Sequence, residues 1–335
     1  MRHREEVLPP RTRIVCYDSA AHRIEIARRS PPLHLREYVR DYVGGREDSA
    51  TPICRREVPT GLVPVILNVA GRVRSPNTRG TWTEHTTFAA GLHESFTFAE
   101  SIGPSDGLQV NFSALGARLF FQGPLHELTN RIVAIEELLG RQAESLLDEL
   151  DDARTWDARF EIVDRLIERR VSDARLPCDP LVWAWRQLVQ SQGRVRINFL
   201  VERIGWSEKT FVKRFRSELG LAPKSFERIL RFSRAYRALV TSDGPRLTDI
   251  AYDAGYYDQA HFTNEFHAFA GVTPIELMAN RLPAGAGVLV RRQEAGAMSR
   301  APSSSHAELH RQVHLSLGAP AINEKPGPTV RTVCR

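Results

Sequence analysis

The stretch that decides the fold is LVERIGWSEKTFVKRFRSELGLAPKSF, residues 200–226, which recurs as IAYDAGYYDQAHFTNEFHAFAGVTPIEL at residues 250–277. The two copies are offset by 50 to 51 residues. The residues that coincide are Gly205 and Gly255, Phe211 and Phe262, Phe215 and Phe266, Gly220 and Gly271, and Pro223 and Pro274. Self-similarity at a fixed period indicates a duplicated structural unit.

Each copy has the order of signals expected for a helix-turn-helix. In the first copy the apolar pair Leu200-Val201 packs an initial helix, and Gly205 follows where its tolerance of positive φ suits a tight turn. Ser207, like Asp258 in the second copy, lies where a helix N-cap is needed. Phenylalanines four residues apart then face the core, which leaves the opposite face of the second helix free to enter a DNA groove.

The segment between the copies, KSFERILRFSRAYRALV at 224–240, predicts an amphipathic helix that joins the two units rigidly. A rigid joint can place two recognition helices one DNA turn apart, about 34 Å, in adjacent major grooves. The alternative is an all-helical repeat without a nucleic-acid role. We favour DNA binding because the duplicated turns coincide with the most basic part of the chain.

Charge is distributed unevenly along the 335 residues, although the whole chain carries only +6. Residues 181–240 contain 13 Lys and Arg against 4 Asp and Glu, a net of +9, whereas residues 241–281 have a net of −4. Phosphate attraction should therefore be concentrated in the first unit. We expect the first unit to contribute more of the DNA affinity than the second.

Residues 181–281 resemble the AraC/XylS family of transcriptional regulators, on the GLAP and GVTP steps, the RFSRAYRAL helix and the signature DIAYDAGYYDQAHFTNEFHAFAG. The resemblance implies double-stranded promoter DNA as partner, with RNA polymerase, a small-molecule effector and a second copy of the chain as further candidates. It leaves open whether the regulator is an activator or a repressor. The DNA-contacting residues implied by position are Glu208, Lys209, Val212, Lys213 and Arg216 in the first unit, and Gln259, Ala260, His261, Thr263 and Asn264 in the second.

The sequence departs from the family pattern at four positions. Asn264 stands where a basic residue is common, and His267 stands where lysine is usual. Arg196 and Arg246 occupy positions where a Ser or Thr cap is frequent. These departures strengthen the expectation that the two units contribute unequally to DNA affinity.

The N-terminal half predicts an α+β domain at 35–176, with a weakly ordered lead-in at 1–34 and a disordered tail at 283–335. Short apolar runs at 63–71, 86–92, 95–101 and 107–113 indicate a small β-sandwich or barrel, and helical spacing follows at 125–171. Residues 178–180, Cys-Asp-Pro, indicate a linker before the next domain. This half resembles the N-terminal domain of one subgroup of the same family, which implies effector sensing or dimerisation.

The apolar stripe of the helical segment has two interpretations. Leu146, Leu150, Phe160, Val163 and Ile167 recur at helical intervals and would share one face. Such a stripe is more often intramolecular core than a dimer seam. Both interpretations stay open from sequence alone.

The sequence contains no convincing catalytic or membrane signal. No phosphate-loop or GxGxxG motif is present, and His85, His93 and His126 are dispersed. We therefore expect no enzyme activity, metal or cofactor; the alternative is a cupin-like metalloenzyme fused to a DNA-binding domain. A DNA-binding protein without sequence preference is the third class. With neither a signal peptide nor a long apolar run, the expected location is cytoplasmic.

Overall fold

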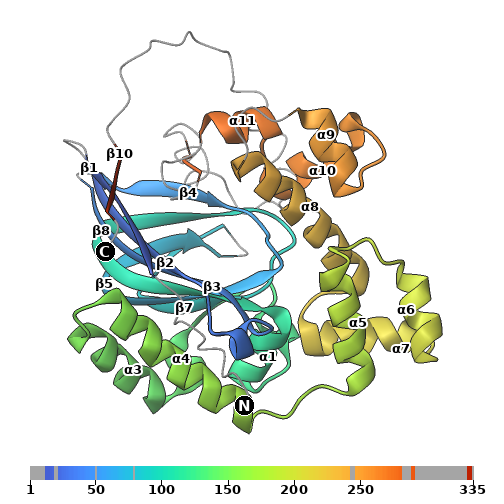
Figure 1. The fold of residues 1–335 in the computed structure, drawn as a ribbon, viewed down its shortest axis with the longest axis horizontal. Helices are drawn as coiled ribbons and strands as arrows, with labels where there is room; N and C mark the ends of the chain where they lie inside the picture. The colour runs from blue at the N-terminus through green and yellow to red at the C-terminus, as the bar shows by residue number, and fades with distance from the viewer. Residues whose placement is uncertain are drawn as a thin grey trace, which may run out of the picture.

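The computed structural model describes residues 12–18, 22–49, 51–77, 80–241, 246–280, 288–290 and 330–333. Figure 1 shows an antiparallel sheet with helices packed against it in the N-terminal half, and a group of helices, α5 to α11, in the C-terminal half. This is the α+β architecture expected from the sequence. No helix in the described ranges is both long enough and apolar enough to cross a membrane.

The strands form one antiparallel hydrogen-bonded sheet, in which the long strand β8 pairs with β3, β4 and β5. Its strands are β1 (Arg13–Asp18), β2 (His22–Arg29), β3 (Val39–Ser49), β4 (Ile53–Glu57), β5 (Leu62–Pro76), β6 (Trp82–His85), β7 (Thr87–Ala90), β8 (Thr97–Ser113), β9 (Ile132–Ala134) and β10 (Val330–Val333). Their order is β10-β1-β2-β3-β8-β5-β7-β9, with β4 also paired to β8 and β6 to β5. Val63, Val65 and Leu67 of β5 are buried because alternate side chains share one face.

The start of the chain differs from the expectation of a weakly ordered lead-in at 1–34. Residues 13–18 and 22–29 are strands β1 and β2, which pair with each other and extend the sheet from β3. Ile24 and Ile26 are buried. Polar and apolar residues alternate in HRIEIARR, residues 22–29, as in a strand. The many arginines of this segment instead favoured the interpretation as a weakly ordered stretch. The part of this segment before residue 12 lies outside the described residues.

The runs at 95–101 and 107–113, expected as separate strands, belong to the single strand β8. Gly103 within it has a φ of 69°, a left-handed conformation that only glycine adopts readily. The glycine-containing segment therefore bends the strand instead of ending it. One half of β8 pairs with β4 and the other with β3, so the strands are joined in one hydrogen-bonded sheet and not in the two separate sheets of a sandwich.

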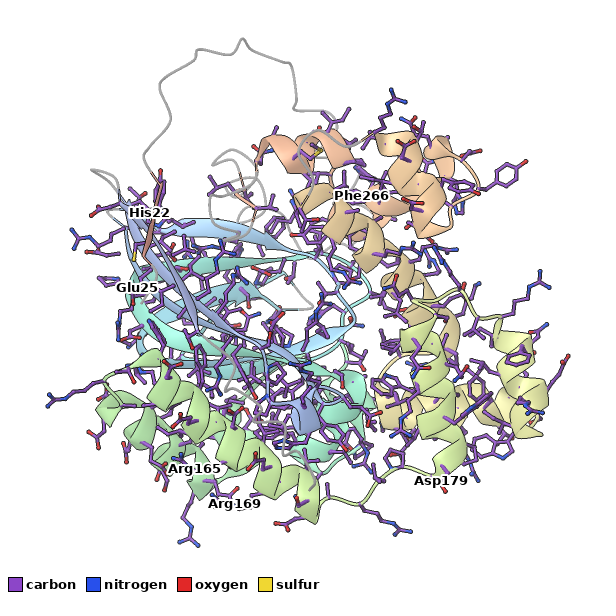
Figure 2. All side chains as sticks on the ribbon, viewed as in Figure 1. His22, Glu25, Arg165, Arg169, Asp179 and Phe266 are labelled. Carbon is purple, nitrogen blue, oxygen red and sulfur yellow. The ribbon has the colours of Figure 1, made fainter. Side chains whose placement is uncertain are left out.

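The helices of the N-terminal half bury the predicted apolar stripe inside the chain. They are α1 (Ala114–Phe121), α2 (Ile135–Leu139), α3 (Arg141–Asp152) and α4 (Trp156–Asp173), with short 3-10 turns η1 (Leu33–Leu35) and η2 (Leu125–Leu128). Leu150, Phe160 and Ile167 are fully buried. Figure 2 shows Arg165 and Arg169 on the opposite face of α4, extending away from the protein. The stripe is thus intramolecular core.

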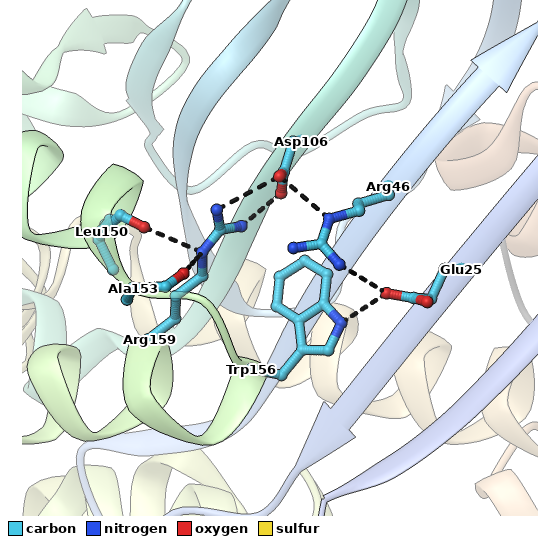
Figure 3. A network of polar contacts seen from close by, with 7 residues as sticks. All are labelled: Glu25, Arg46, Asp106, Leu150, Ala153, Trp156 and Arg159. Atoms are coloured by element: carbon cyan, nitrogen blue, oxygen red, sulfur yellow. Dashed lines mark hydrogen bonds and ion pairs between the residues drawn. The ribbon is translucent and has the colours of Figure 1, made fainter. Parts of the chain in front are cut away.

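A polar network fastens α4 to the sheet, and Figure 3 shows its members: Glu25, Arg46, Asp106, Leu150, Ala153, Trp156 and Arg159. The indole of Trp156 donates a hydrogen bond to Glu25 at 2.8 Å and lies between two guanidinium groups. The ring centroid is 4.7 Å from Cζ of Arg46 and 5.1 Å from Cζ of Arg159. Asp106 accepts hydrogen bonds from both arginines. Beneath the indole is Gly44 of β3, where a Cβ atom would lie 2.4 Å from Trp156 Cε3.

The C-terminal half consists of α5 (Asp179–Gln190), α6 (Ile197–Ile204), α7 (Glu208–Leu219), α8 (Pro223–Thr241), α9 (Leu247–Ala254), α10 (Gln259–Ala270) and α11 (Pro274–Ala279). Cys178 occupies the N-cap position of α5 without a side-chain hydrogen bond, and Pro180 lies in the first turn, so the expected linker at 178–180 is the start of a helix. Pro223 and Pro274 open α8 and α11, as predicted.

The C-terminal tail is described only at two short segments. Residues 288–290 lie beside β4, where Arg56 N donates to Val288 O at 2.8 Å and Val290 N donates to Cys54 O at 3.0 Å. Residues 330–333 form β10, which pairs with β1. These two segments pair with the sheet, and the remainder of 283–335, on which the prediction of a disordered tail rests, lies outside the described residues.

Candidate nucleic-acid interface

The first helix-turn-helix unit consists of α6 and α7. α6 ends at Gly205, whose φ of 75° is left-handed. Ser207 caps α7, its Oγ accepting a hydrogen bond from Thr210 N at 3.2 Å. Phe211 and Phe215 are fully buried with their rings 5.5 Å apart. The turn, the cap and the buried face predicted from the sequence are confirmed.

The second unit, α9 and α10, repeats this geometry. Gly255 ends α9 with a φ of 86°, and Asp258 Oδ1 accepts a hydrogen bond from His261 N at 2.7 Å. Phe262 and Phe266 are fully buried, again 5.5 Å apart. Figure 2 shows Phe266 in the interior of this helical cluster. The duplicated sequence therefore folds as a duplicated structure.

Helix α8 belongs to the cores of both units. Near its start, Phe226 packs against Phe215 of α7 with ring centroids 6.1 Å apart. Further along, Phe232 packs against Phe266 of α10 with ring centroids 5.1 Å apart. Figure 1 shows α8 running from one unit to the other. A continuous helix buried at both ends fixes the relative orientation of the two units.

The outward face of α7 brings the predicted contact residues of the first unit together. Glu208, Lys209, Lys213 and Arg216 are exposed, and Val212 is partly buried. These five residues line an open groove of about 740 Å³, which Ser217 and His126 of η2 complete. The charged side chains on this face are three cations and one carboxylate. Such a surface attracts a polyanion.

The outward face of α10 is polar without being basic. Gln259, Ala260, His261 and Asn264 are exposed, and Thr263 is partly buried. The Thr263 hydroxyl donates to the Gln259 carbonyl at 2.8 Å, and His261 lies edge-on to Tyr256 with ring centroids 5.4 Å apart. Gln259 and Asn264 carry the amide groups that can pair with adenine in a major groove.

Comparison with known proteins agrees with this geometry. A model described as a helix-turn-helix domain matches residues 200–280, and a domain of unknown function, DUF6597, matches residues 27–134. An uncharacterised HTH-type transcriptional regulator of Bacillus subtilis, YbfI, is 27% identical over 143 residues, which is 41% of this chain and 48% of that protein. The chain thus spans about half the length of this curated relative.

The duplicated helices decide the assignment. Residues 200–280 form a helix-turn-helix domain of the AraC type. Among solved structures, ToxT from Vibrio cholerae is 12% identical with a TM-score of 0.40, covering 68% of this chain and 96% of its own. The DNA-binding domain of AdpA, in complex with a target DNA, is 27% identical with a TM-score of 0.28, covering 30% and 92%.

The two units of the AraC-type domain differ at the aromatic residue of the turn. In the first, Arg214 of α7 lies over the Trp206 ring at 4.7 Å. In the second, the repeat-equivalent residue is Glu265, so the cation over Tyr256 comes instead from Arg231 of α8, at 5.1 Å. Burial and the nearby Glu265 carboxylate raise the pKa of Tyr256.

Glu265 is buried on the inward side of α10 and paired with two arginines of α8. Arg228 Nε donates to it at 2.8 Å, and Arg231 Nε lies 3.3 Å from its other oxygen. One of the six acidic residues in 241–281 is therefore neutralised within the core and does not face the solvent. The outward surface of the second unit is therefore less acidic than the composition of residues 241–281 indicated.

The N-terminal half packs directly against the AraC-type domain, which sequence reasoning missed. The Thr129 hydroxyl donates to Gly220 O at 2.8 Å, and Arg118 of α1 pairs with Glu218 of α7 at 2.7 Å. His126 Nδ1 lies 3.1 Å from Ser217 O. The partners are about 90 to 100 positions apart. No periodicity or motif in the sequence connects them.

His85 and His126, two of the dispersed histidines, lie in different parts of the structure. His85 lies on β6, where burial lowers its pKa, while His126 lies beside α7. Within the part of the chain that the structure describes, no group of three His, Cys, Asp or Glu is placed to hold a metal ion.

Proposed function

We propose that this protein is a sequence-specific DNA-binding transcriptional regulator whose recognition helices α7 and α10 enter adjacent major grooves of promoter DNA. The observation that carries the proposal is the duplication itself: two capped helices of equal length, each with an exposed outward face, held on the shared helix α8. In helix-turn-helix proteins the second helix of each unit contacts the base edges.

The two recognition helices have different roles in this proposal. Lys209, Lys213 and Arg216 give α7 a cationic surface that attracts DNA phosphates and can bind guanine. Helix α10 has no lysine or arginine, and it discriminates bases through the amides of Gln259 and Asn264. The first unit supplies most of the affinity, and the second adds sequence preference.

The N-terminal half takes the sensing role in this proposal. The stripe at 141–171 is consumed by the core, so a homodimer would have to use another surface. An effector that alters the packing of η2 and α1 on α7 would reach the DNA-binding surface directly, because Thr129 and Arg118 contact that helix terminus. RNA polymerase and the effector stay candidate partners without an assigned surface.

The test is the affinity of the full chain for native promoter DNA and for scrambled DNA across a salt series. Lys213→Ala should weaken binding by about 1–3 kcal/mol if the lysine contacts a base, or lower the log–log salt slope by about 1 on all sequences if it contacts a phosphate. Gln259→Ala should relax preference at a few base pairs and leave the slope unchanged.

Lys224→Ala is the matched control, because Lys224 is also an exposed lysine and pairs with Glu227 on α8 at 2.9 Å. It should bind DNA like the unaltered protein. Equal binding by Lys213→Ala and Lys224→Ala would reject α7 as a DNA-contacting helix. An equal fall in salt slope for Gln259→Ala and Lys213→Ala would reject the division of roles.

A further inference from the structure

The groove along α7 has a second wall that the DNA-binding domain does not provide. Its lining combines five residues of the outward face of α7 with His126, which belongs to the turn η2 of the N-terminal half. The turn is held there by the bond from Thr129 to Gly220, and the preceding helix α1 is held to α7 by the pair of Arg118 and Glu218. A ligand that occupies the face of α7 therefore meets His126 as well.

The ring of His126 is oriented by a single hydrogen bond. Nδ1 lies 3.1 Å from the Ser217 carbonyl oxygen, and since a carbonyl can only accept, Nδ1 carries the proton. Nε2 lies on the opposite side of the ring, and the side chain is exposed. The other charged groups that line the groove are Glu208, Lys209, Lys213 and Arg216.

The dimensions of DNA indicate what would lie at this position. The major groove is about 12 Å wide, and an α-helix with its side chains is about 10–12 Å across. A recognition helix thus fills the groove from wall to wall. A side chain that borders the outward face of the helix consequently lies level with the sugar–phosphate backbone that forms the wall.

We propose that His126 contacts a backbone phosphate of the DNA bound by α7, so that the N-terminal half forms part of the DNA interface. In the bound state the ring holds a proton on each nitrogen: Nδ1–H donates to Ser217 O and Nε2–H donates to a phosphate oxygen. The second proton comes from the solvent. This inference rests on the proposed function, because it assumes that α7 lies in a major groove.

The experiment measures DNA affinity of the full chain across a salt series for His126→Ala, His126→Lys and His34→Ala, beside Lys213→Ala. Loss of one phosphate contact lowers the log–log salt slope by about 0.9. His126→Ala should show this fall and bind several-fold more weakly on native and scrambled DNA alike. His126→Lys restores a cation and should restore the slope.

His34→Ala is the control, because His34 is an exposed histidine that pairs with Glu168 of α4 at 2.7 Å, outside the groove. It should bind like the unaltered protein. An unchanged slope for His126→Ala, while Lys213→Ala loses affinity, would overturn this inference and leave the proposed function standing. Tighter binding by His126→Ala would also overturn it, since η2 would then obstruct the DNA. If Lys213→Ala is unaffected as well, the proposed function fails.

Discussion

Arg56 of β4 donates a hydrogen bond to the carbonyl oxygen of Ala270, the last residue of α10, at 3.1 Å. Thr129 makes the corresponding bond at the end of α7, to Gly220 at 2.8 Å. Carbonyls at a helix C-terminus lack partners within the helix. The N-terminal half therefore satisfies such a carbonyl at the C-terminal ends of both α7 and α10, by two unrelated side chains.

The contact at the end of α10 predicts a difference between two glycine substitutions in the second unit. Gly255 and Gly271 both have left-handed φ, so alanine at either position costs about 1–2 kcal/mol of strain. A Cβ at Gly255 meets nothing within 4 Å, whereas one at Gly271 would lie 2.3 Å from Phe96 of the N-terminal half. Gly271→Ala should lose a further ~1–3 kcal/mol through overpacking.

Urea denaturation of the two variants measures this difference. Gly255→Ala serves as the control, because it carries the backbone strain without the clash. Equal free energies of unfolding for the two variants would show that α10 does not rest on Phe96.

The buried carboxylate of the second unit predicts a second contrast. Glu265→Ala leaves Arg231 largely buried without its partner, and removing one member of a buried ion pair costs about 3–5 kcal/mol. Arg214→Ala, at the equivalent position of the first unit, removes only an exposed cation over Trp206, worth about 0.5–1 kcal/mol. Chemical denaturation of both variants checks the order, and a larger loss for Arg214→Ala would contradict it.

The buried stripe of α3 predicts a change in stability without a change in oligomeric state. Leu150 is fully buried, so Leu150→Ala should lower the free energy of unfolding by about 2–5 kcal/mol. Leu147, on the same helix but only partly buried, is the matched control and should lose much less. Light scattering of both variants tests the alternative, since a dimer that dissociates in Leu150→Ala would place the stripe at a subunit interface.

The features predicted correctly from the sequence are those governed by neighbouring residues. Gly205 and Ser207 specify a turn and a cap within a few positions, so the helix-turn-helix and its exposed face follow from the local sequence alone. The site residues themselves stay predictions, although the structure places them on the outward faces of α7 and α10.

The features that could not be predicted depend on contacts distant in sequence or on competing signals. His126 reaches Ser217 across 91 positions, and no local pattern indicates that pairing. The burial of Ile24 and Ile26 depends on pairing with β3, which the arginine-rich composition concealed. Gly103 lies inside the single strand β8, but its sequence indicates a strand boundary. A glycine that bends a strand and a glycine that ends one cannot be distinguished from neighbouring residues.

The indole of Trp156 packs against the backbone of Gly44, so the docking of α4 depends on the register of β3. A shift of β3 by one residue would turn its side chains to the opposite face. A shift by two would place Tyr42 or Arg46 under the ring, where a Cβ atom has no room. A sheet misaligned by two residues would therefore leave Trp156 and the apolar face of that helix in water. We therefore expect the docking of α4 to favour the native register of β3 while the N-terminal half folds.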